Sequence, residues 1–400
     1  MFTIYPNFFV SQIFEVPEIY YSKVALLNIS VFIFLLSLFF GFKLFQNWKT
    51  ALFLSTIKSG LFFFYFFFFF NKTNFNEIDS LTYIEGTKAL IDSVISLDDF
   101  VNFNNFRAHG GGHYFYYIYS FLLAKIFGSY IFVPIAFNVL STYFGGYLIL
   151  KILSKYYKIN NELCKLLTVI FLLHWENIFW SSFFNLRDIL IQTVILLSTY
   201  NFIKFIEDSK NVIINFCILL ITFSILFILR VHIAIGLYAL FIILYFFIKE
   251  ISAKKILGIL LMSVMSFFYI NELVDITMQW FDIFDFSYGL NFVKFFLSPI
   301  PFTHLYNGYG FLIFSMPINL ILFPFIILGI IRLFKMNKIV TVVLVFVFFF
   351  ISTIISGYEN VQGPRQRLMV IPFLYIFQLI GLITAITYFK NTFNIRLRHK

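Results

Sequence analysis

The sequence has few charged residues. Asp, Glu, Lys and Arg make up 12% of its 400 residues, whereas a soluble domain carries about 25%. Hydrophobic residues make up 61%, and the mean hydropathy is +0.91. A soluble fold cannot bury that much apolar surface, so the composition excludes a soluble globular protein and favours one that faces lipid.

Cysteine is nearly absent. The two cysteines, Cys164 and Cys217, each lie at or inside an apolar segment, which argues against a disulfide framework and against a cysteine-based metal site. The chain opens with the residues MFTIYPNFFV, which include no basic stretch. A cleaved secretory signal is therefore not expected, and the first apolar segment should remain in the protein.

Long apolar runs recur along the chain. A run of about 17 to 25 apolar residues crosses the hydrocarbon core as a helix, because a helix satisfies its own backbone hydrogen bonds where water is absent. Eleven such runs are predicted, at 24–42, 51–70, 130–150, 166–184, 189–206, 212–229, 233–248, 256–270, 311–331, 339–356 and 369–389. Lys58 lies inside the second run, where we expect its side chain to reach the headgroups. The sequence thus predicts an all-α integral membrane protein, with residues 1–400 as a single polytopic domain.

The basic residues indicate how the chain is oriented. Lysine and arginine gather in alternate connections between runs and are spread through short loops, so they are explained by topology rather than by nucleic-acid binding. The positive-inside rule makes those connections cytoplasmic and sends residues 71–113 and 271–310 outside as two external loops. The aromatic, helical segment 113–127 would reverse the first loop if it crossed the membrane. It is therefore predicted as an interfacial or re-entrant helix.

The first external loop contains two groups of candidate site residues. Asp79 can deprotonate an acceptor hydroxyl at the membrane surface, although an ordinary solvated loop acid explains it as well. Arg107 and His109 precede the glycines 110–112 and can contact a phosphate, with a flexible loop as the alternative. The glycines argue against a helical metal pair of His109 and His113, so no metal is assigned, although a divalent cofactor stays possible.

Further charged residues lie at external turns and inside one run. Arg187 and Asp188 occupy a tight external turn and Arg230 the next one; they are candidates for ligand binding, and membrane anchors or a local ion pair are the alternatives. His174 and Glu176 lie deeper, where ionisable groups are costly and usually face the interior of a bundle. They are better candidates for structural or functional pairing than for a role as ordinary loop residues.

Arg365 and Arg367 precede the last run on the external side. Their position goes against the positive-inside tendency, which favours an anionic partner. A guanidinium group can bind phosphate through two parallel hydrogen bonds. A specific phosphate site and a lipid headgroup both satisfy this pattern.

The serial order of these features resembles the GT-C superfamily of polytopic glycosyltransferases, especially the branch of protein mannosyltransferases and lipid A aminoarabinose transferases. The resemblance covers roughly residues 75–390. It rests on Asp79 before Tyr83, the aromatic segment 114–128, the turn 186–188 with Tyr200 later in its helix, Arg230 at the end of a run, and Arg365-Gln-Arg367 before Pro372.

The resemblance implies that the chain moves a hexosyl or pentosyl group from a polyprenyl-phosphate donor to a glycan, lipid or protein acceptor on the extracytoplasmic face, in cell-envelope synthesis. It implies that Asp79 is the general base. Substrate-binding roles are implied for Tyr83, Arg107, His109, Arg187, Asp188, Arg230, Arg365 and Arg367. The expected location is a bacterial inner (plasma) membrane, since the composition is typical of AT-rich genes.

Other functions remain open from the sequence. An O-antigen or exopolysaccharide polymerase is also polytopic and uses lipid-linked sugars, and residues 271–310 are a modest candidate for the large late loop that it needs. A transporter or flippase should have broken helices and matched halves, and neither is predicted here. A purely structural membrane protein would not require arginines that face outward.

Overall fold

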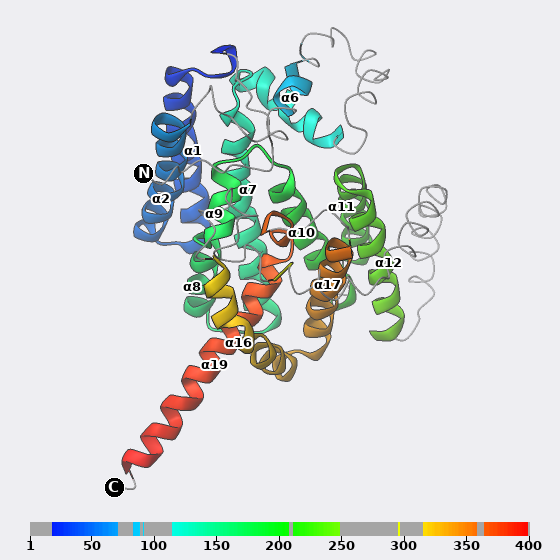
Figure 1. Ribbon diagram of the computed structural model, residues 1–400. Helices are drawn as coiled ribbons and strands as arrows, with labels where there is room; N and C mark the ends of the chain where they lie inside the picture. The colour runs from blue at the N-terminus through cyan, green and yellow to red at the C-terminus, as the bar shows by residue number, and fades with distance from the viewer. Residues whose placement is uncertain are drawn as a thin grey trace.

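The computed structural model describes residues 18–70, 83–88, 91, 114–207, 211–248, 295–296, 315–357 and 364–398. These residues form helices and their connections and include no strand. Most of the long helices run side by side between two ends of the molecule (Figure 1). The predicted all-α fold class is confirmed, and its relation to GT-C proteins stays a prediction.

The helices occupy most of the described residues. They are η1 (Glu18–Tyr20), α1 (Lys23–Phe45), α2 (Trp48–Phe64) with the π-helix η2 (Tyr65–Phe69), α6 (Tyr114–Phe127), α7 (Phe132–Lys151) with the π-helix η3 (Ile152–Tyr156), α8 (Asn161–Leu172), α9 (Trp175–Ser182), α10 (Asp188–Glu207), α11 (Val212–Leu229), α12 (Val231–Ile248), α16 (Ser315–Met336), α17 (Lys338–Gly357), α18 (Pro364–Arg367) and α19 (Ile371–Arg398).

The chain is a multi-pass membrane protein. Within the described residues, nine helices are long and apolar enough to cross a bilayer, or ten if the bent pair α8 and α9 is one span. Together they cover ten of the eleven predicted runs. The run at 256–270 lies outside the described residues, as does the proposed loop 271–310 apart from residues 295–296.

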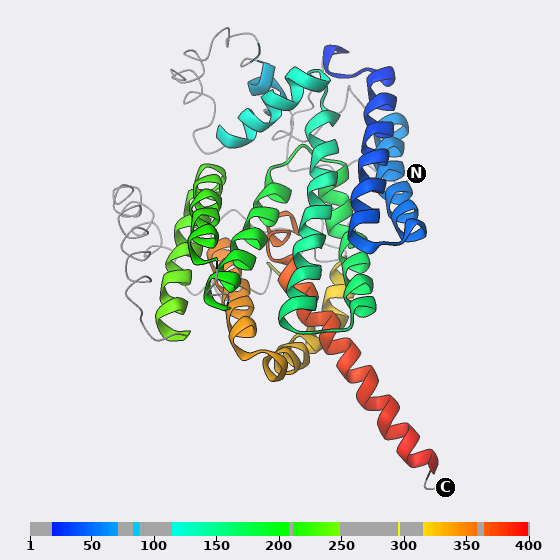
Figure 2. The same cartoon turned by 180° about the vertical axis from the view of Figure 1, so that it is seen from behind.

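The two ends of the molecule differ. At one end, which we call the α6 end, α6 lies across the tops of the long helices, and α7, α10 and α12 begin there (Figures 1 and 2). At the other, the C-terminal end, the connections α1–α2, α7–α8 and α16–α17 are found, and α19 extends beyond the rest of the bundle. A helix over 113–127 is confirmed by α6; its interfacial location stays a prediction.

The connection between α1 and α2 is a tight turn. Gln46 ends α1 in the left-handed region, with φ of 53°. The Asn47 side chain then caps α2, since its Oδ1 accepts hydrogen bonds from the backbone N–H groups of Lys49 and Thr50 at 3.0 and 3.4 Å. These two residues allow α1 and α2 to pack against each other as a hairpin.

Lys58 does not reach the headgroups, and that expectation is wrong. Its side chain is fully buried, its Nζ donates to Thr142 Oγ1 of α7, and it lies 5.5 Å from the centroid of the Tyr143 ring. A hydrogen bond and an aromatic face inside the protein replace water for a group that would be costly to leave in lipid. Lys58 therefore joins α2 to α7.

The predicted run 166–184 is not one helix. It breaks after Leu173, and α8 and α9 meet at a bend of 50°, which corrects the expectation of unbroken helices. The backbone is satisfied locally, because the Phe171 carbonyl accepts from the N–H of His174 at 3.1 Å and from Asn177 Nδ2 at 3.0 Å. Non-helical backbone at membrane depth is stable where the protein supplies such partners.

Packing separates an inner set of helices from an outer one. In α7 and α10, 72% of the apolar window is buried, whereas the figure is 33% for α1 and α2 and 22% for α16. The exposed side chains of the outer helices are large and apolar, for example Val24, Phe53 and Ile321, which suits contact with lipid. The inner helices α7 and α10 therefore supply the framework on which polar side chains can be positioned.

The outer helix α16 is held against α19 by two glycines. A Cβ atom placed on Gly329 would overlap the carbonyl of Phe377, and one on Gly381 would overlap the carbonyl of Phe325. Small residues allow membrane helices to approach this closely, and dispersion contacts between backbones then stabilise the pair. This crossing sets the direction of α19, which begins shortly after the short helix α18.

Candidate functional site

Four charged side chains meet near the α6 end of the bundle. Arg187 precedes α10, Asp188 is the first residue of α10, Arg230 lies between α11 and α12, and Arg365 belongs to α18. Electrostatic interactions link Asp188 with all three arginines. We call these four residues the arginine cluster; its arginines come from three separate parts of the chain, namely the turn before α10, the α11–α12 junction and α18.

Asp188 is the centre of the arginine cluster. Its carboxylate is 2% exposed; Oδ2 accepts a hydrogen bond from Arg365 Nε at 2.9 Å, and Oδ1 lies 3.7 Å from Arg230 Nη1. The position at the start of α10 adds the favourable field of a helix N-terminus. Asp188 thus connects distant parts of the chain, which goes beyond the local ion pair that its neighbour Arg187 suggested.

Arg187 and Arg230 each contact a further group: Arg187 a backbone carbonyl and Arg230 a methionine sulfur. Arg187 Nη1 donates to the carbonyl of Leu229 in the last turn of α11, a group left without a partner inside its own helix. Arg230 Nη1 lies 3.6 Å from Met369 Sδ. Burial lowers the pKa of Arg230 to about 10, against the opposing effect of Asp188, so this guanidinium is charged at neutral pH.

Positive charge predominates among the four residues of the arginine cluster. In the part of the chain that the structure describes, three guanidinium groups surround one carboxylate. The side chains of Arg230 and Arg365 are only 16% and 20% exposed, so they are largely shielded from water. An anion that enters between them would gain charge-assisted hydrogen bonds. The arginine cluster is therefore a candidate anion-binding site.

Tyrosines from the α6 side lie beside the arginine cluster. Tyr83 packs edge-on against Tyr116, with ring centroids 4.7 Å apart, and it interacts electrostatically with Arg230. Tyr116 of α6 is fully buried, and burial raises the pKa of its hydroxyl well above the ordinary value. A neutral phenol adds no negative charge beside the arginines, which suits a wall of a site for an anion.

A hydrogen-bond network positions the turn that carries Arg187. Tyr116 donates to Asn185 Oδ1 at 2.6 Å, while Asn138 Nδ2 of α7 donates to the Tyr116 hydroxyl at 3.3 Å and to the carbonyl of Leu186 at 2.8 Å. All of these groups are buried. Because Asn185 and Leu186 directly precede Arg187, the network fixes the backbone from which its side chain extends.

Arg367 has a different environment from the cluster arginines. It is fully buried, and its Nε and Nη2 donate to both carboxylate oxygens of Glu176. Its Nη1 donates to the carbonyls of Phe295 and Phe296 at 3.2 and 2.7 Å. With four of its five N–H groups engaged, Arg367 anchors α18 and so determines where Arg365 lies.

The bend between α8 and α9 supports this ion pair. Asn319 Nδ2 of α16 donates to Glu176 Oε1 at 3.3 Å. Gln192 Nε2 of α10 donates to Asn177 Oδ1 at 3.1 Å and to the carbonyl of Leu368 at 2.6 Å. The bend therefore directs polar side chains of α9 towards α10 and the segment after α18.

His174 marks the bend itself. It is 9% exposed, and its ring packs edge-on against Tyr375 with centroids 4.8 Å apart. Glu176, two residues later, pairs with Arg367. The expectation that His174 and Glu176 belong to a structural pairing is met for Glu176, whose partner is an arginine 191 residues away.

The structure brings together five of the predicted site residues: Tyr83, Arg187, Asp188, Arg230 and Arg365. Arg367 lies next to them along the chain but points into the ion pair with Glu176. The remaining predicted residues, Asp79, Arg107 and His109, lie outside the described residues. Sequence reasoning gave no specific role to Tyr116 or Asn138, because an aromatic residue and a single amide are unremarkable in apolar helices.

Metal ligands do not gather in the described part of the chain: no group there has three or more histidine, cysteine, aspartate or glutamate side chains suited to an ion. Cys164 and Cys217 are both free thiols. The fold and the arginine cluster thus define a multi-pass α-helical membrane protein with a candidate anion site near one end. No protein-family model, curated protein or solved structure matches the chain, so its function has to be argued from these residues.

Proposed function

We propose that the chain is a membrane glycosyltransferase that moves a sugar from a polyprenyl-phosphate donor to an acceptor hydroxyl. The observation that carries this proposal is the arginine cluster, in which three arginines face one carboxylate near one end of a membrane-spanning bundle. A phosphate attached to a lipid reaches such a position from within the bilayer. Its sugar would extend towards α6 and the first loop.

The charge of the arginine cluster suits the chemistry of the leaving group. In the transfer, the acceptor oxygen forms a bond to the anomeric carbon, the bond from that carbon to the phosphate oxygen breaks, and the acceptor proton goes to a general base. The phosphate gains negative charge as the bond breaks, and guanidinium groups already in place stabilise that charge. In-line attack would invert the anomeric carbon. Arg230 and Arg365, whose side chains are 16% and 20% exposed, are suited to contact the phosphate.

Asp79 remains the proposed base. It lies four residues before Tyr83, and four extended residues span at most about 14 Å. Because Tyr83 interacts with Arg230, Asp79 is tethered within that distance of a residue beside the arginine cluster. Arg107 and His109 precede α6 in the same loop and are proposed to bind the donor or the acceptor.

The side of the membrane follows from the basic residues. Five lysines lie at helix ends or in connections of the C-terminal end: Lys151, Lys155, Lys158, Lys335 and Lys338. The positive-inside rule makes that end cytoplasmic. The arginine cluster then lies near the extracytoplasmic end, which supports a role in cell-envelope glycan or glycolipid synthesis at a bacterial inner membrane.

The bend between α8 and α9 favours a second candidate, a transporter, because discontinuous helices often hold transported substrates. Here the polar groups at the bend have protein partners, namely Asn177 with Phe171 and Glu176 with Arg367. Because these polar groups bind other protein groups, the bend is better explained as a support for α18 than as part of a transport pathway. The transferase therefore remains the preferred proposal.

Sugar transfer in isolated membranes tests the proposal. Membranes that contain the protein are given a panel of labelled polyprenyl-phosphate hexoses and pentoses, and transfer to acceptor is compared for the native chain, Asp79→Asn, Arg365→Met and the control Arg332→Gln, which changes an exposed arginine of α16. We expect Asp79→Asn to lower the rate at least about 100-fold and Arg365→Met to lower it similarly. The control should be unaffected.

Two results would contradict the proposal in different ways. Undiminished transfer by Asp79→Asn would remove the assigned base while leaving the enzyme class intact. Absence of transfer by the native protein with every donor of the panel would remove the enzyme class, and uptake or efflux of the same lipid-linked sugars would then favour a transporter.

A further inference from the structure

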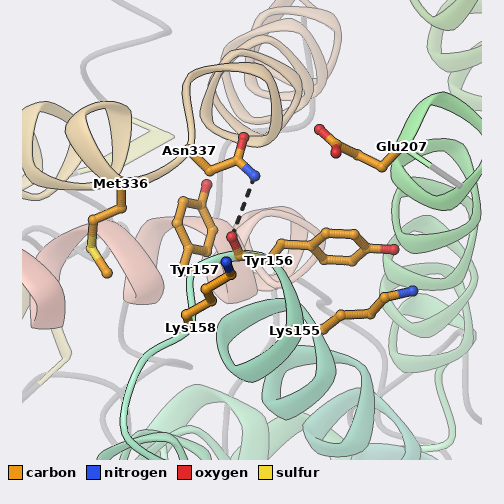
Figure 3. Close-up of a pocket in the computed structure, with 7 residues that line it drawn as sticks. All are labelled: Lys155, Tyr156, Tyr157, Lys158, Glu207, Met336 and Asn337. Atoms are coloured by element: carbon orange, nitrogen blue, oxygen red, sulfur yellow. Dashed lines mark hydrogen bonds between the residues drawn. The ribbon is translucent and has the colours of Figure 1, made fainter.

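A polar cavity lies at the C-terminal end, at the opposite end of the bundle from the arginine cluster. It has a volume of about 500 Å³ and lies between the α7–α8 connection, the end of α10 and the α16–α17 turn. Figure 3 shows Lys155 and Lys158 from the first of these elements, Glu207 from the second and Asn337 from the third around this space.

The local backbone at the two lysines is unusual. Lys155 lies in the π-helix η3, where α7 widens before it ends, and such single π-turns often occur at functional sites. Lys158 has a φ of 51°, a left-handed conformation that is uncommon for a residue with a long side chain. The connection is then closed by a hydrogen bond from the N–H of Ile159 to the carbonyl of Leu153 at 3.3 Å.

The walls of the cavity are tied together. Asn337 Nδ2 donates to the carbonyl of Tyr156 at 3.3 Å (Figure 3), and Asn337 Oδ1 caps α17 by accepting from the N–H of Val340 at 3.1 Å. The hydroxyls of Tyr157 and Thr341 lie 2.9 Å apart within hydrogen-bond distance. The α7–α8 connection and the α16–α17 turn are thereby held at a set separation, so the cavity is formed without a ligand.

The charged groups around the cavity are not neutralised within the described residues. Neither Lys155 nor Lys158 has a carboxylate there within ion-pair distance, and Glu207 has no ion pair there either, although all three line the same space. The positive-inside rule explains why lysines are found at this end. It does not explain why two of them line the same cavity, or why Lys158 has a left-handed backbone conformation there.

We propose that this cavity binds a phosphate group, with Lys155 and Lys158 as its ligands. Lysine binds phosphate as a compact positive charge, and the hydrogen bonds of Asn337 hold the walls around the two lysines in place. The phosphate can belong to a phospholipid headgroup of the leaflet at this end or to a phosphorylated molecule from the adjoining aqueous phase. This site is independent of the proposed transferase activity and of the arginine cluster.

Two binding measurements on the purified full-length protein test the site and distinguish the sources. Calorimetric titration with inorganic pyrophosphate reports a soluble ligand. Native mass spectrometry after reconstitution into nanodiscs of phosphatidylcholine with phosphatidylglycerol reports retained anionic lipid. Both are made on the native protein, Lys155→Gln/Lys158→Gln, Glu207→Gln and the control Lys49→Gln, which removes a lysine at the same end that lines a different cavity.

We expect the double lysine variant to lose about tenfold in affinity for one of the two probes, since two exposed charge pairs are removed. Glu207→Gln should gain about threefold, because a repelling carboxylate is neutralised. Lys49→Gln should bind as the native protein does. A loss confined to phosphatidylglycerol identifies a lipid headgroup, and a loss confined to pyrophosphate identifies a soluble ligand. Unchanged binding of both probes by the double variant, or an equal loss in Lys49→Gln, would overturn the proposal.

Discussion

At the scale of single residues, Asp188 keeps three arginines together. Replacing it by Asn would leave these guanidinium groups close to one another with no cluster carboxylate. Breaking a buried ion pair from one side costs about 3–5 kcal/mol. We therefore expect Asp188→Asn to lower the free energy of unfolding by an amount in that range.

An added anion should partly restore the Asp188→Asn variant, because a ligand that binds only the folded state stabilises it. Thermal unfolding in detergent is followed with increasing inorganic pyrophosphate, and sodium chloride of equal ionic strength is the control. Pyrophosphate should raise the melting temperature of the variant more than that of the native protein. An equal rise in both proteins would show that the arginine cluster does not take up the anion.

The pair of Glu176 and Arg367 is a second residue-scale test. Both side chains are fully buried, so Glu176→Gln or Arg367→Met alone should destabilise the protein by about 3–5 kcal/mol. The double variant Glu176→Gln/Arg367→Met should be less destabilised than the sum of the two, with a coupling of up to about 3 kcal/mol. Strictly additive effects in chemical denaturation would contradict the pairing.

Individual charges in this sequence were easier to predict than their partners. Arg187, Asp188, Arg230 and Arg365 stand out because a charge at the end of an apolar run is costly and therefore informative. The partner of each charge depends on how connections far apart in sequence meet, as Arg365 does with Asp188 over 177 residues. The local sequence pattern does not show which distant residues meet in the fold. For this reason the pairing of Glu176 with Arg367 is seen only in the structure.

At the scale of helices, the crossing of α16 and α19 gives a prediction about close packing. Gly381→Val would place side-chain atoms against the backbone of α16, where no room exists, and overpacking of this kind costs about 1–3 kcal/mol or more. We expect a lower melting temperature and a shift in α18. Gly60→Ala in α2 is the matched control, because a Cβ there meets no atom within 4 Å.

The comparison of the two glycine variants is measured by thermal unfolding and size-exclusion chromatography in detergent. Equal stability of Gly381→Val and Gly60→Ala would show that α16 and α19 are not held by this contact. The pair thus separates an effect of close packing from the general effect of adding a side chain to a membrane helix.

The helices themselves follow largely from hydropathy. Ten of the predicted runs correspond to helices because an apolar run must satisfy its backbone internally. The bend between α8 and α9 was not predictable in this way. No proline interrupts residues 166–184, and the residues after the bend stay apolar enough to continue the run. The break is stabilised by Asn177, whose side chain donates a hydrogen bond to the carbonyl of Phe171. A hydropathy profile contains no information on such a contact.

At the scale of the whole molecule, the proposed orientation can be checked by chemical labelling. Ser80→Cys and Lys158→Cys are made in a chain whose Cys164 and Cys217 have been replaced by Ala. An impermeant maleimide added to intact cells should label Ser80→Cys, while Lys158→Cys should react only after the membrane is permeabilised. The reverse pattern would invert the topology and place the arginine cluster on the cytoplasmic side.

The burial of Lys58 has a consequence for biosynthesis. Its partner Thr142 follows it by 84 residues. The Lys58 side chain therefore cannot make this hydrogen bond until α7 has been synthesised. A lysine in the middle of a span resists release into lipid. The nascent α1–α2 hairpin should therefore stay beside the insertion machinery until α7 emerges, and the order of translation would then decide when the first part of the bundle can assemble.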